Sequence, residues 1–192
     1  MPLNRKQVED LETLRAFVHP LRNRLLGALR IDGPATASEL ARRFDESSGA
    51  TSYHLRQLAR YGFVEDDGEQ PSRRERRWRA SHELTSWETA DFVGDPAGRS
   101  ALRVLARERV GWIVDQLQRW YAERRDWPRP WISAAQDSDL VLRLRPEDLA
   151  SLGRQMWELV SRYADQQRPP DDPEAERVVV YLHAFPTKDV VL

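Results

Sequence analysis

The chain has 192 residues, no cysteine, and 30 basic against 31 acidic side chains. This length suits one small domain plus a second part, or one extended dimer-forming unit. The N-terminal residues do not resemble a signal peptide and no 18-residue stretch lacks charge, so we expect a cytoplasmic protein without a membrane span. The absence of cysteine fits a reducing compartment.

The first thirty residues predict two packing helices. Apolar side chains recur with helical spacing at Val8, Leu11, Leu14 and Val18. Pro20 suits the first turn of the next helix, where a missing N–H costs nothing. The apolar face of that helix holds Leu21, Leu25, Ala28 and Leu29.

Residues 36–62 predict a helix-turn-helix. Thr36, followed three positions later by Glu39, forms the pattern of a capping box. A polar turn at 45–48 supplies a new N-cap serine, and Gly62 is placed to end the second helix in a left-handed conformation. The inward face of the second helix is expected to hold Thr51, Leu55 and Leu58.

The opposite face of the second helix is the predicted DNA-recognition surface. It combines glycine with hydroxyl, amide, aromatic and guanidinium side chains, which are types that contact bases and phosphates. His54 lies at the border of the buried face, so a packing role and a DNA contact both fit its position. The predicted contacts are Ser48, Gly49, Ser52, Tyr53, His54, Arg56, Gln57 and Arg60.

Residues 63–79 predict a hairpin with a basic returning strand, in which residues 73–79 hold five arginines against one glutamate. Such a cluster neutralises phosphates and releases counterions. The alternative is a solvated edge that discourages aggregation. Since 28 of the 30 basic residues are arginine, the clustering carries the prediction. The predicted contacts of this wing are Arg73, Arg74, Arg76 and Arg77.

The next segment predicts a hinge and a long helix. The stretch 94–98 contains two glycines and a proline, which indicates a hinge. Apolar residues then recur with helical period from about 100 to 125, until Pro128 and Pro130 end the helix.

The C-terminal part predicts a β-α-β element. Residues 140–144 and 178–185 have the apolar composition of strands, and a helix between them starts at Pro146. The expected fold is mainly α with a small β content (α+β). It comprises a winged helix-turn-helix DNA-binding domain in residues 1–82, then a long linking helix and the β-α-β element in a dimerisation or effector region at residues 83–192.

Tryptophan is concentrated in the second region, which holds six of the seven. Indole rings supply flat contact area and one donor, so they suit a cavity for a small aromatic or lipid-like effector. The alternative is that they fill cores and subunit contacts. The predicted lining of such a cavity is Trp112, Trp127, Trp131, Trp157 and Tyr181.

Taken in order, four stretches resemble the winged helix-turn-helix of ArsR-type bacterial transcriptional regulators. The resemblance covers roughly residues 8–82 and extends weakly into the C-terminal extension of longer actinobacterial members. It implies a homodimer, most often a repressor, that places paired recognition helices in successive major grooves of a roughly palindromic operator, with the wings alongside. Because dimers of this family form through terminal helices, the resemblance makes the long helix at about 100–125 the first candidate for the subunit contact, and packing onto its own chain is the alternative. The stretches are 14–26, which contains His19-Pro20-Leu21-Arg22, then 36–41, 52–58 and 61–64.

The sequence predicts no catalytic site, cofactor or metal. Metal-sensing relatives carry cysteine pairs where this chain has residues 38–44 without a soft ligand, and its four histidines form no helical pair with a second ligand. A carboxylate site for a harder cation stays open. A phosphate-binding glycine loop and a nucleophile elbow are both missing.

The segment charges favour nucleic acid as the partner of the N-terminal half. Residues 1–82 carry 15 basic and 12 acidic side chains, a net of +3, whereas residues 83–192 carry 15 and 19, a net of −4. The sequence therefore predicts a homodimeric regulator of double-stranded DNA. The rival hypothesis is a winged-helix module that binds an acidic protein partner, and affinity for random duplex at low salt separates the two.

Overall fold

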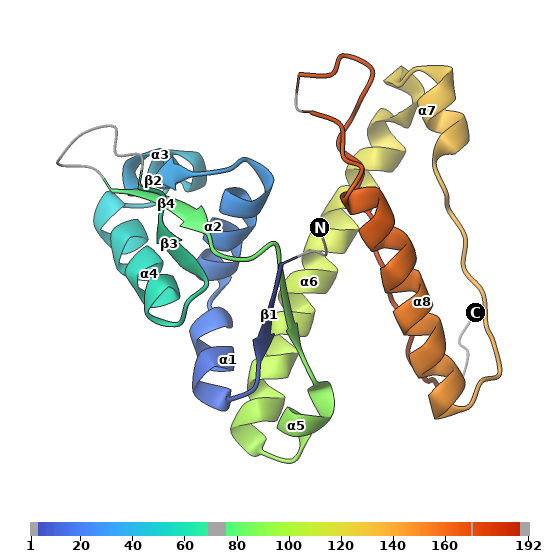
Figure 1. Ribbon diagram of the computed structural model, residues 1–192, viewed down its shortest axis with the longest axis horizontal. Helices are drawn as coiled ribbons and strands as arrows, with labels where there is room; N and C mark the ends of the chain where they lie inside the picture. The colour runs from blue at the N-terminus through green and yellow to red at the C-terminus, as the bar shows by residue number, and fades with distance from the viewer. Residues whose placement is uncertain (1–3, 69–75, 170, 189–192) are drawn as a thin grey trace. The chain divides into compact units, whose positions relative to one another are not determined.

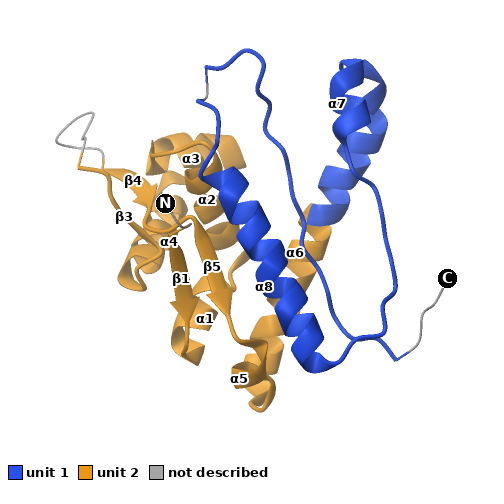
Figure 2. Cartoon of the chain, turned by 45° about the vertical axis from the view of Figure 1, so that its right-hand side comes forward, with its two compact units in different colours: residues 1–3, 113–192 blue, residues 4–112 orange. Residues whose placement is uncertain are grey.

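The computed structural model of the protein describes residues 4–68, 76–169 and 171–188 (Figure 1). They form two compact units, the first holding residues 4–112 and the second the described residues from 113 onwards (Figure 2). In chain order, the first unit contains β1 (Arg5–Val8), α1 (Leu11–Phe17), α2 (Pro20–Ile31), β2 (Ala35–Thr36), α3 (Ala37–Phe44), α4 (Ser48–Arg60), β3 (Val64–Asp66), β4 (Arg77–Ala80), β5 (Leu84–Trp87), α5 (Thr89–Val93) and the start of α6 (Pro96–Glu123). The second unit contains the end of α6, then η1 (Arg124–Asp126), α7 (Arg129–Ala134) and α8 (Pro146–Ala164).

The predicted helix-turn-helix is formed by α3 and α4. The Glu39 amide donates to Thr36 Oγ1 at 3.2 Å and the Thr36 amide donates to Glu39 Oε2 at 2.7 Å, which confirms the capping box. Asp45 ends α3 in the left-handed region at φ 54°. The Ser47 hydroxyl then accepts from the Ala50 amide and opens α4.

The wing is a β-hairpin fixed to the start of α3. Strands β2, β4 and β3 form an antiparallel sheet in that order, so Trp78 of β4 lies opposite Ala35 on one side and Asp66 on the other. Gly62, at φ 69°, turns the chain from α4 into β3, as predicted. Because β2 runs directly into α3, hydrogen bonds hold the base of the wing beside the helix-turn-helix.

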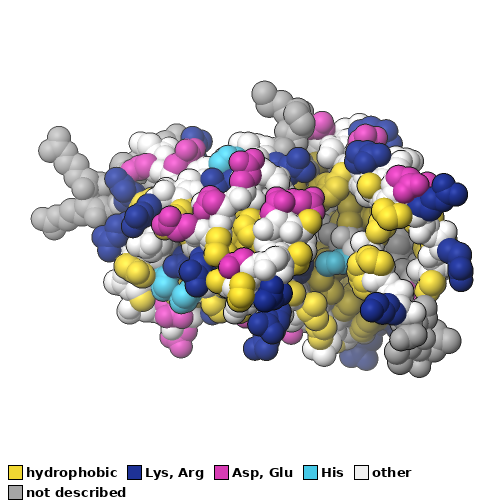
Figure 3. Space-filling view, turned by 90° about the horizontal axis from the view of Figure 1, so that it is seen from below, with side chains coloured by type: hydrophobic (Ala, Val, Ile, Leu, Met, Phe, Trp, Pro, Cys, Tyr) yellow, Lys and Arg dark blue, Asp and Glu magenta, His cyan; other side chains and the backbone are white. Residues whose placement is uncertain are grey.

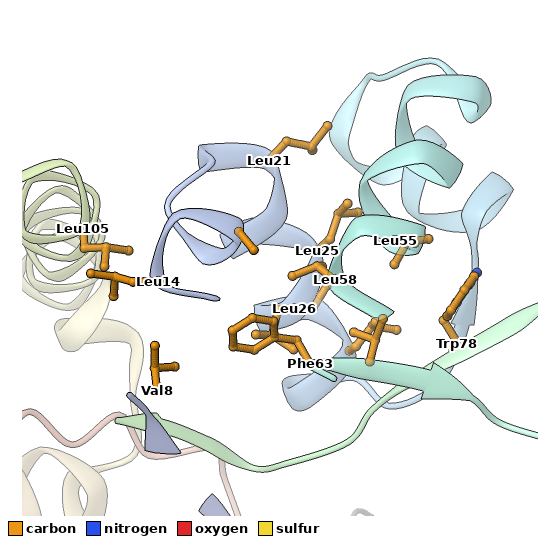
Figure 4. Packing of buried hydrophobic residues seen from close by; sticks show 14 of the residues in the cluster. Val8, Leu14, Leu21, Leu25, Leu26, Leu55, Leu58, Phe63, Trp78 and Leu105 are labelled. Carbon is orange, nitrogen blue, oxygen red and sulfur yellow. The ribbon is translucent and has the colours of Figure 1, made fainter. Parts of the chain in front are cut away.

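One hydrophobic core joins α2, α4 and the wing (Figure 4). Leu25, Leu55, Leu58 and Phe63 are fully buried, and Trp78 of β4 belongs to the same cluster. Fully burying a side chain of this size contributes about 1.5–3 kcal/mol. The core therefore fixes α4 along one side only and leaves the other side open.

The N-terminal segment differs from the predicted helix. Helices α1 and α2 are present, but Val8 lies in strand β1, which pairs in parallel with β5 and places Val8 opposite Trp87. Strand β5 supplies an edge that only the folded chain creates, and pairing with it satisfies the backbone of β1. The helical spacing from Val8 to Leu11 is coincidental, because a two-residue match cannot distinguish a strand end from a helix turn.

The prediction of a hinge at 94–98 is wrong. The Asp95 carboxylate accepts from the Gly98 amide at 2.7 Å and its carbonyl accepts from the Arg99 amide at 2.9 Å, so α6 already begins at Pro96. A Cβ on Gly98 would lie 2.3 Å from the carbonyl oxygen of Phe92. This glycine therefore marks a close backbone approach between α5 and α6.

In the second unit the helices are confirmed and the predicted strands are wrong. Helix α8 begins at Pro146 as expected, and the long helix α6 ends before the prolines that follow Trp127. Residues 140–144 and 178–185, however, contain no assigned strand. A strand needs a neighbour to accept its hydrogen bonds, and a single chain supplies no ladder for either segment within its described residues. No described helix has the length and apolar character needed to cross a bilayer.

Candidate nucleic-acid interface

The recognition helix α4 divides into two faces as its periodicity predicts. Thr51, Leu55 and Leu58 are buried without measurable exposure, which confirms the inward face. On the other side, Tyr53 is 52% exposed and Arg56 also lies at the surface. Among the remaining predicted contacts, Ser48, Gly49 and Arg60 are exposed, and Ser52, His54 and Gln57 are half-buried.

A groove of about 410 Å³ lies between the helix-turn-helix and the base of the wing. Hydroxyl groups and two guanidinium groups on its walls are hydrogen-bond donors of the kind that contact phosphate oxygens. Three predicted contacts from α4 and one from the wing thus share one surface. Its lining residues are Thr36, Ala37, Ser38, Ser48, Ser52, Arg56, Arg76 and Trp78.

The described arginines of the wing are each placed by a neighbour. Arg76 Nε lies 2.9 Å from Asp66 Oδ2, and its guanidinium stacks over the Trp78 ring at 5.0 Å. Arg77 donates to the Pro34 carbonyl at 2.8 Å and lies 3.7 Å from an Asp67 oxygen. Arg77 therefore ties β4 to the segment before β2, while Arg73 and Arg74 lie outside the described residues.

The sequence did not predict that acidic residues of the hairpin pair with its arginines. Arg79 Nη2 lies 2.8 Å from Glu65 Oε1, and the antiparallel register places these two residues directly opposite each other. Together with Asp66 and Asp67, Glu65 offsets part of the positive charge that residues 73–79 concentrate. The signal was present, because the antiparallel return of a hairpin brings the acidic residues that precede its turn beside the arginines that follow it.

His54, for which the sequence allows either a packing role or a DNA contact, packs against another histidine. Its ring lies against His19 with centroids 4.3 Å apart, and the edge of the Tyr53 ring meets it at 5.2 Å. Burial, and then the nearby charges of His19 and Arg22, lower the pKa of His54. His19 was not predicted, because a contact across 35 positions of sequence depends on how α2 packs against α4.

The structure describes all five predicted effector residues, with Trp112 in the first unit and the other four in the second. Trp127 and Trp131 meet edge to face with centroids 6.3 Å apart, Trp112 and Trp157 are 46% and 41% exposed, and burial raises the pKa of Tyr181. An effector site formed by these five residues stays a prediction.

A surface hollow of about 350 Å³ in the second unit is lined by Gln155, Met156, Glu158, Leu159 and Arg162.

Comparison with known protein families identifies the domain that carries this surface. Residues 17–67 match the family model described as a helix-turn-helix domain, which spans α2, α3, α4 and β3. This stretch is a helix-turn-helix domain, similar to those of ArsR-type regulators, and further sequence follows it. No curated protein matches the chain.

Proposed function

We propose that the protein is a homodimeric transcriptional repressor that binds a palindromic operator through α4 and the wing. The helix-turn-helix domain supports a DNA-binding regulator. One observation carries the proposal: Leu55 and Leu58 fix α4 from inside, while Tyr53 and Arg56 point out next to a groove that also contains Arg76. A helix held in this way suits insertion into a major groove about 12 Å wide.

The two kinds of contact have different tasks in this proposal. Exposed side chains of α4, above all Tyr53 and Arg56, contact base edges and determine sequence preference. Arg76 at the base of the wing contacts phosphate and determines position and general affinity. Because Arg76 is paired with Asp66 in the free protein, contact with DNA exchanges that carboxylate for a phosphate.

Dimerisation is assigned to the exposed apolar stripe of α6. Val110, Val114, Leu117 and Tyr121 recur at helical spacing, and they are between 40% and 57% exposed. Such a stripe suits packing against a second helix with the same stripe. The second copy supplies the second recognition helix that a palindromic site requires.

Repression follows from occupancy, because a dimer seated on its operator covers DNA that the transcription machinery needs. An effector bound in the C-terminal region acts, in this proposal, by changing the separation of the two recognition helices. A changed separation weakens simultaneous binding to both half-sites.

Selection of bound duplexes from a random pool tests the proposal. We expect enrichment of a twofold-symmetric site whose half-sites lie about 10 base pairs, or one helical turn, apart. A second selection with the Arg56→Ala protein, which keeps the fold and the wing, is expected to lose bases from each half-site. Recovery of random sequences by the unaltered protein, or of a single asymmetric half-site, would contradict the proposed dimer on a palindrome.

A further inference from the structure

The paired histidines lie beside the proposed DNA surface and outside the groove. His19 is an exposed residue just before α2, and its ring packs against half-buried His54 of α4 at 4.3 Å. The pair adjoins Tyr53, a predicted DNA contact, through a ring contact at 5.2 Å. Figure 3 shows histidine side chains at the surface, next to basic and acidic side chains.

The hydrogen bonds of the pair indicate that its uncharged form suits the free protein. His19 Nδ1 accepts from the Leu21 amide at 3.2 Å and so caps α2, which a proton on that nitrogen would prevent. His54 Nδ1 is buried and has no hydrogen-bond partner among the described residues. A second ring proton, placed on Nδ1, therefore finds no acceptor among the described residues in either histidine.

Burial and the nearby positive charges also favour the uncharged form of both rings. Burial comes first and the Arg22 charge second in lowering the pKa of His19, and burial followed by His19 and Arg22 lowers the pKa of His54. Glu46, between α3 and α4, acts against this on both rings. Tyr61 also faces Arg22 from the end of α4, with its hydroxyl donating to Glu12.

We propose that a DNA backbone phosphate binds at His19, Arg22 and His54 and brings a proton onto the histidine pair, so that DNA binding is linked to proton uptake. The inference rests on the proposed function and adds a regulatory contact to it. Arg22 Nη2 donates to the Arg15 carbonyl at 3.1 Å, but its buried Nε has no hydrogen-bond partner among the described residues. A phosphate supplies acceptor oxygens for this nitrogen and for the two rings. Exposed His19 and adjacent Tyr53 place this contact beside the recognition face of α4.

The sign of the pH dependence follows from linkage. In the free protein the histidine pKa values lie below 6.5, and a bound phosphate raises them, so the complex holds more protons than the free protein. Affinity therefore rises as pH falls through the window between the two sets of values. One linked proton gives a slope of up to about tenfold per pH unit.

The experiment measures affinity for a fluorescent duplex of random sequence by anisotropy, from about pH 8 to 5.5 at constant ionic strength. Calorimetry in two buffers of different ionisation enthalpy counts the protons taken up. The full chain is compared with His54→Gln and with His19→Asn, because asparagine retains an N-cap acceptor for α2. His82→Gln is the matched control: burial also lowers the pKa of His82, but it lies between β4 and β5.

We expect the affinity of the unaltered protein and of the His82→Gln control to rise as pH falls. The affinity of His54→Gln should not change with pH, and that of His19→Asn should change less steeply than that of the unaltered protein. A slope that persists in His54→Gln, a flat profile in the unaltered protein, or affinity that falls in acid would each overturn the inference. If the unaltered protein binds DNA with the same affinity at every pH, the proton-linked contact is refuted but the proposed function is not. No binding at any pH defeats both, and circular dichroism verifies that each variant is folded.

Discussion

Arg56 and Arg76 line the same groove but are held in different ways. Arg56 extends from the exposed face of α4, whereas Arg76 is fixed between the Asp66 carboxylate and the Trp78 ring. A side chain on a recognition helix can reach base edges, and one at the base of a wing reaches the backbone. The surroundings of each guanidinium, and not its residue type, therefore determine its expected role.

Replacing these two arginines separately should give different losses. Arg56→Ala is expected to cost about 1–3 kcal/mol on the preferred duplex and much less on random duplex, because a base contact is lost. Arg76→Ala should weaken both alike and reduce the salt slope by about 1. Titrations of both duplexes measure this, with exposed Arg168→Ala as the control. Equal losses on both duplexes for Arg56→Ala would contradict the division of roles.

At the residue scale, sequence predicts what periodicity controls. The inward position of Leu55 and the outward position of Tyr53 follow from a helix of 3.6 residues per turn. The contact between His19 and His54 does not follow, because it joins two helices whose packing only the folded core determines. The pairing of Arg79 with Glu65 lies between these cases, since it follows from hairpin register once the turn is located.

At the element scale, helices were predicted better than strands. Helix α3 carries its own start signal in Thr36 and Glu39, and α4 carries its own end signal in Gly62. Strand β1 was missed because it exists only where β5 offers an edge. The segments 140–144 and 178–185 were overpredicted for the same reason: extended composition forms a strand only beside a partner.

The junction between α5 and α6 gives a test of close packing. Gly98→Ala should lower the free energy of unfolding by about 1–3 kcal/mol, because its Cβ would meet the backbone oxygen of Phe92 at 2.3 Å. Gly111→Ala in the same helix meets open space and should stabilise by about 0.5–1 kcal/mol. Thermal and denaturant unfolding of the two variants measures the contrast. A neutral or stabilising Gly98→Ala would show that the junction is loose.

At the scale of the whole molecule, the chain divides within α6 at residue 112. The net charge divides at a different place: residues 1–82, with a net charge of +3, contain the helix-turn-helix, and residues 83–192 have a net charge of −4. These opposite net charges favour the N-terminal part as the one that binds a polyanion, which stays a prediction. The exposed stripe on α6 is the surface that we assign to the second copy.

A charge placed in that stripe tests the dimer. Leu117→Glu should shift the protein from dimer to monomer, because dimerisation would bury a carboxylate without a partner. Gln118→Glu adds the same charge at the next exposed position and should leave the dimer unchanged. Sedimentation equilibrium gives the masses of both variants. An unaltered protein that is already monomeric, or a dimeric Leu117→Glu, would refute the assignment to this stripe.

The salt dependence of binding to random duplex tests the central claim most directly. The full chain is titrated against labelled duplex by anisotropy while salt is raised from about 50 to 200 mM. We predict clear affinity at low salt and a straight decline of log affinity against log salt, with a slope near −0.9 for each phosphate contacted. An absence of affinity at the lowest salt would contradict DNA binding and favour a winged-helix module that binds an acidic protein.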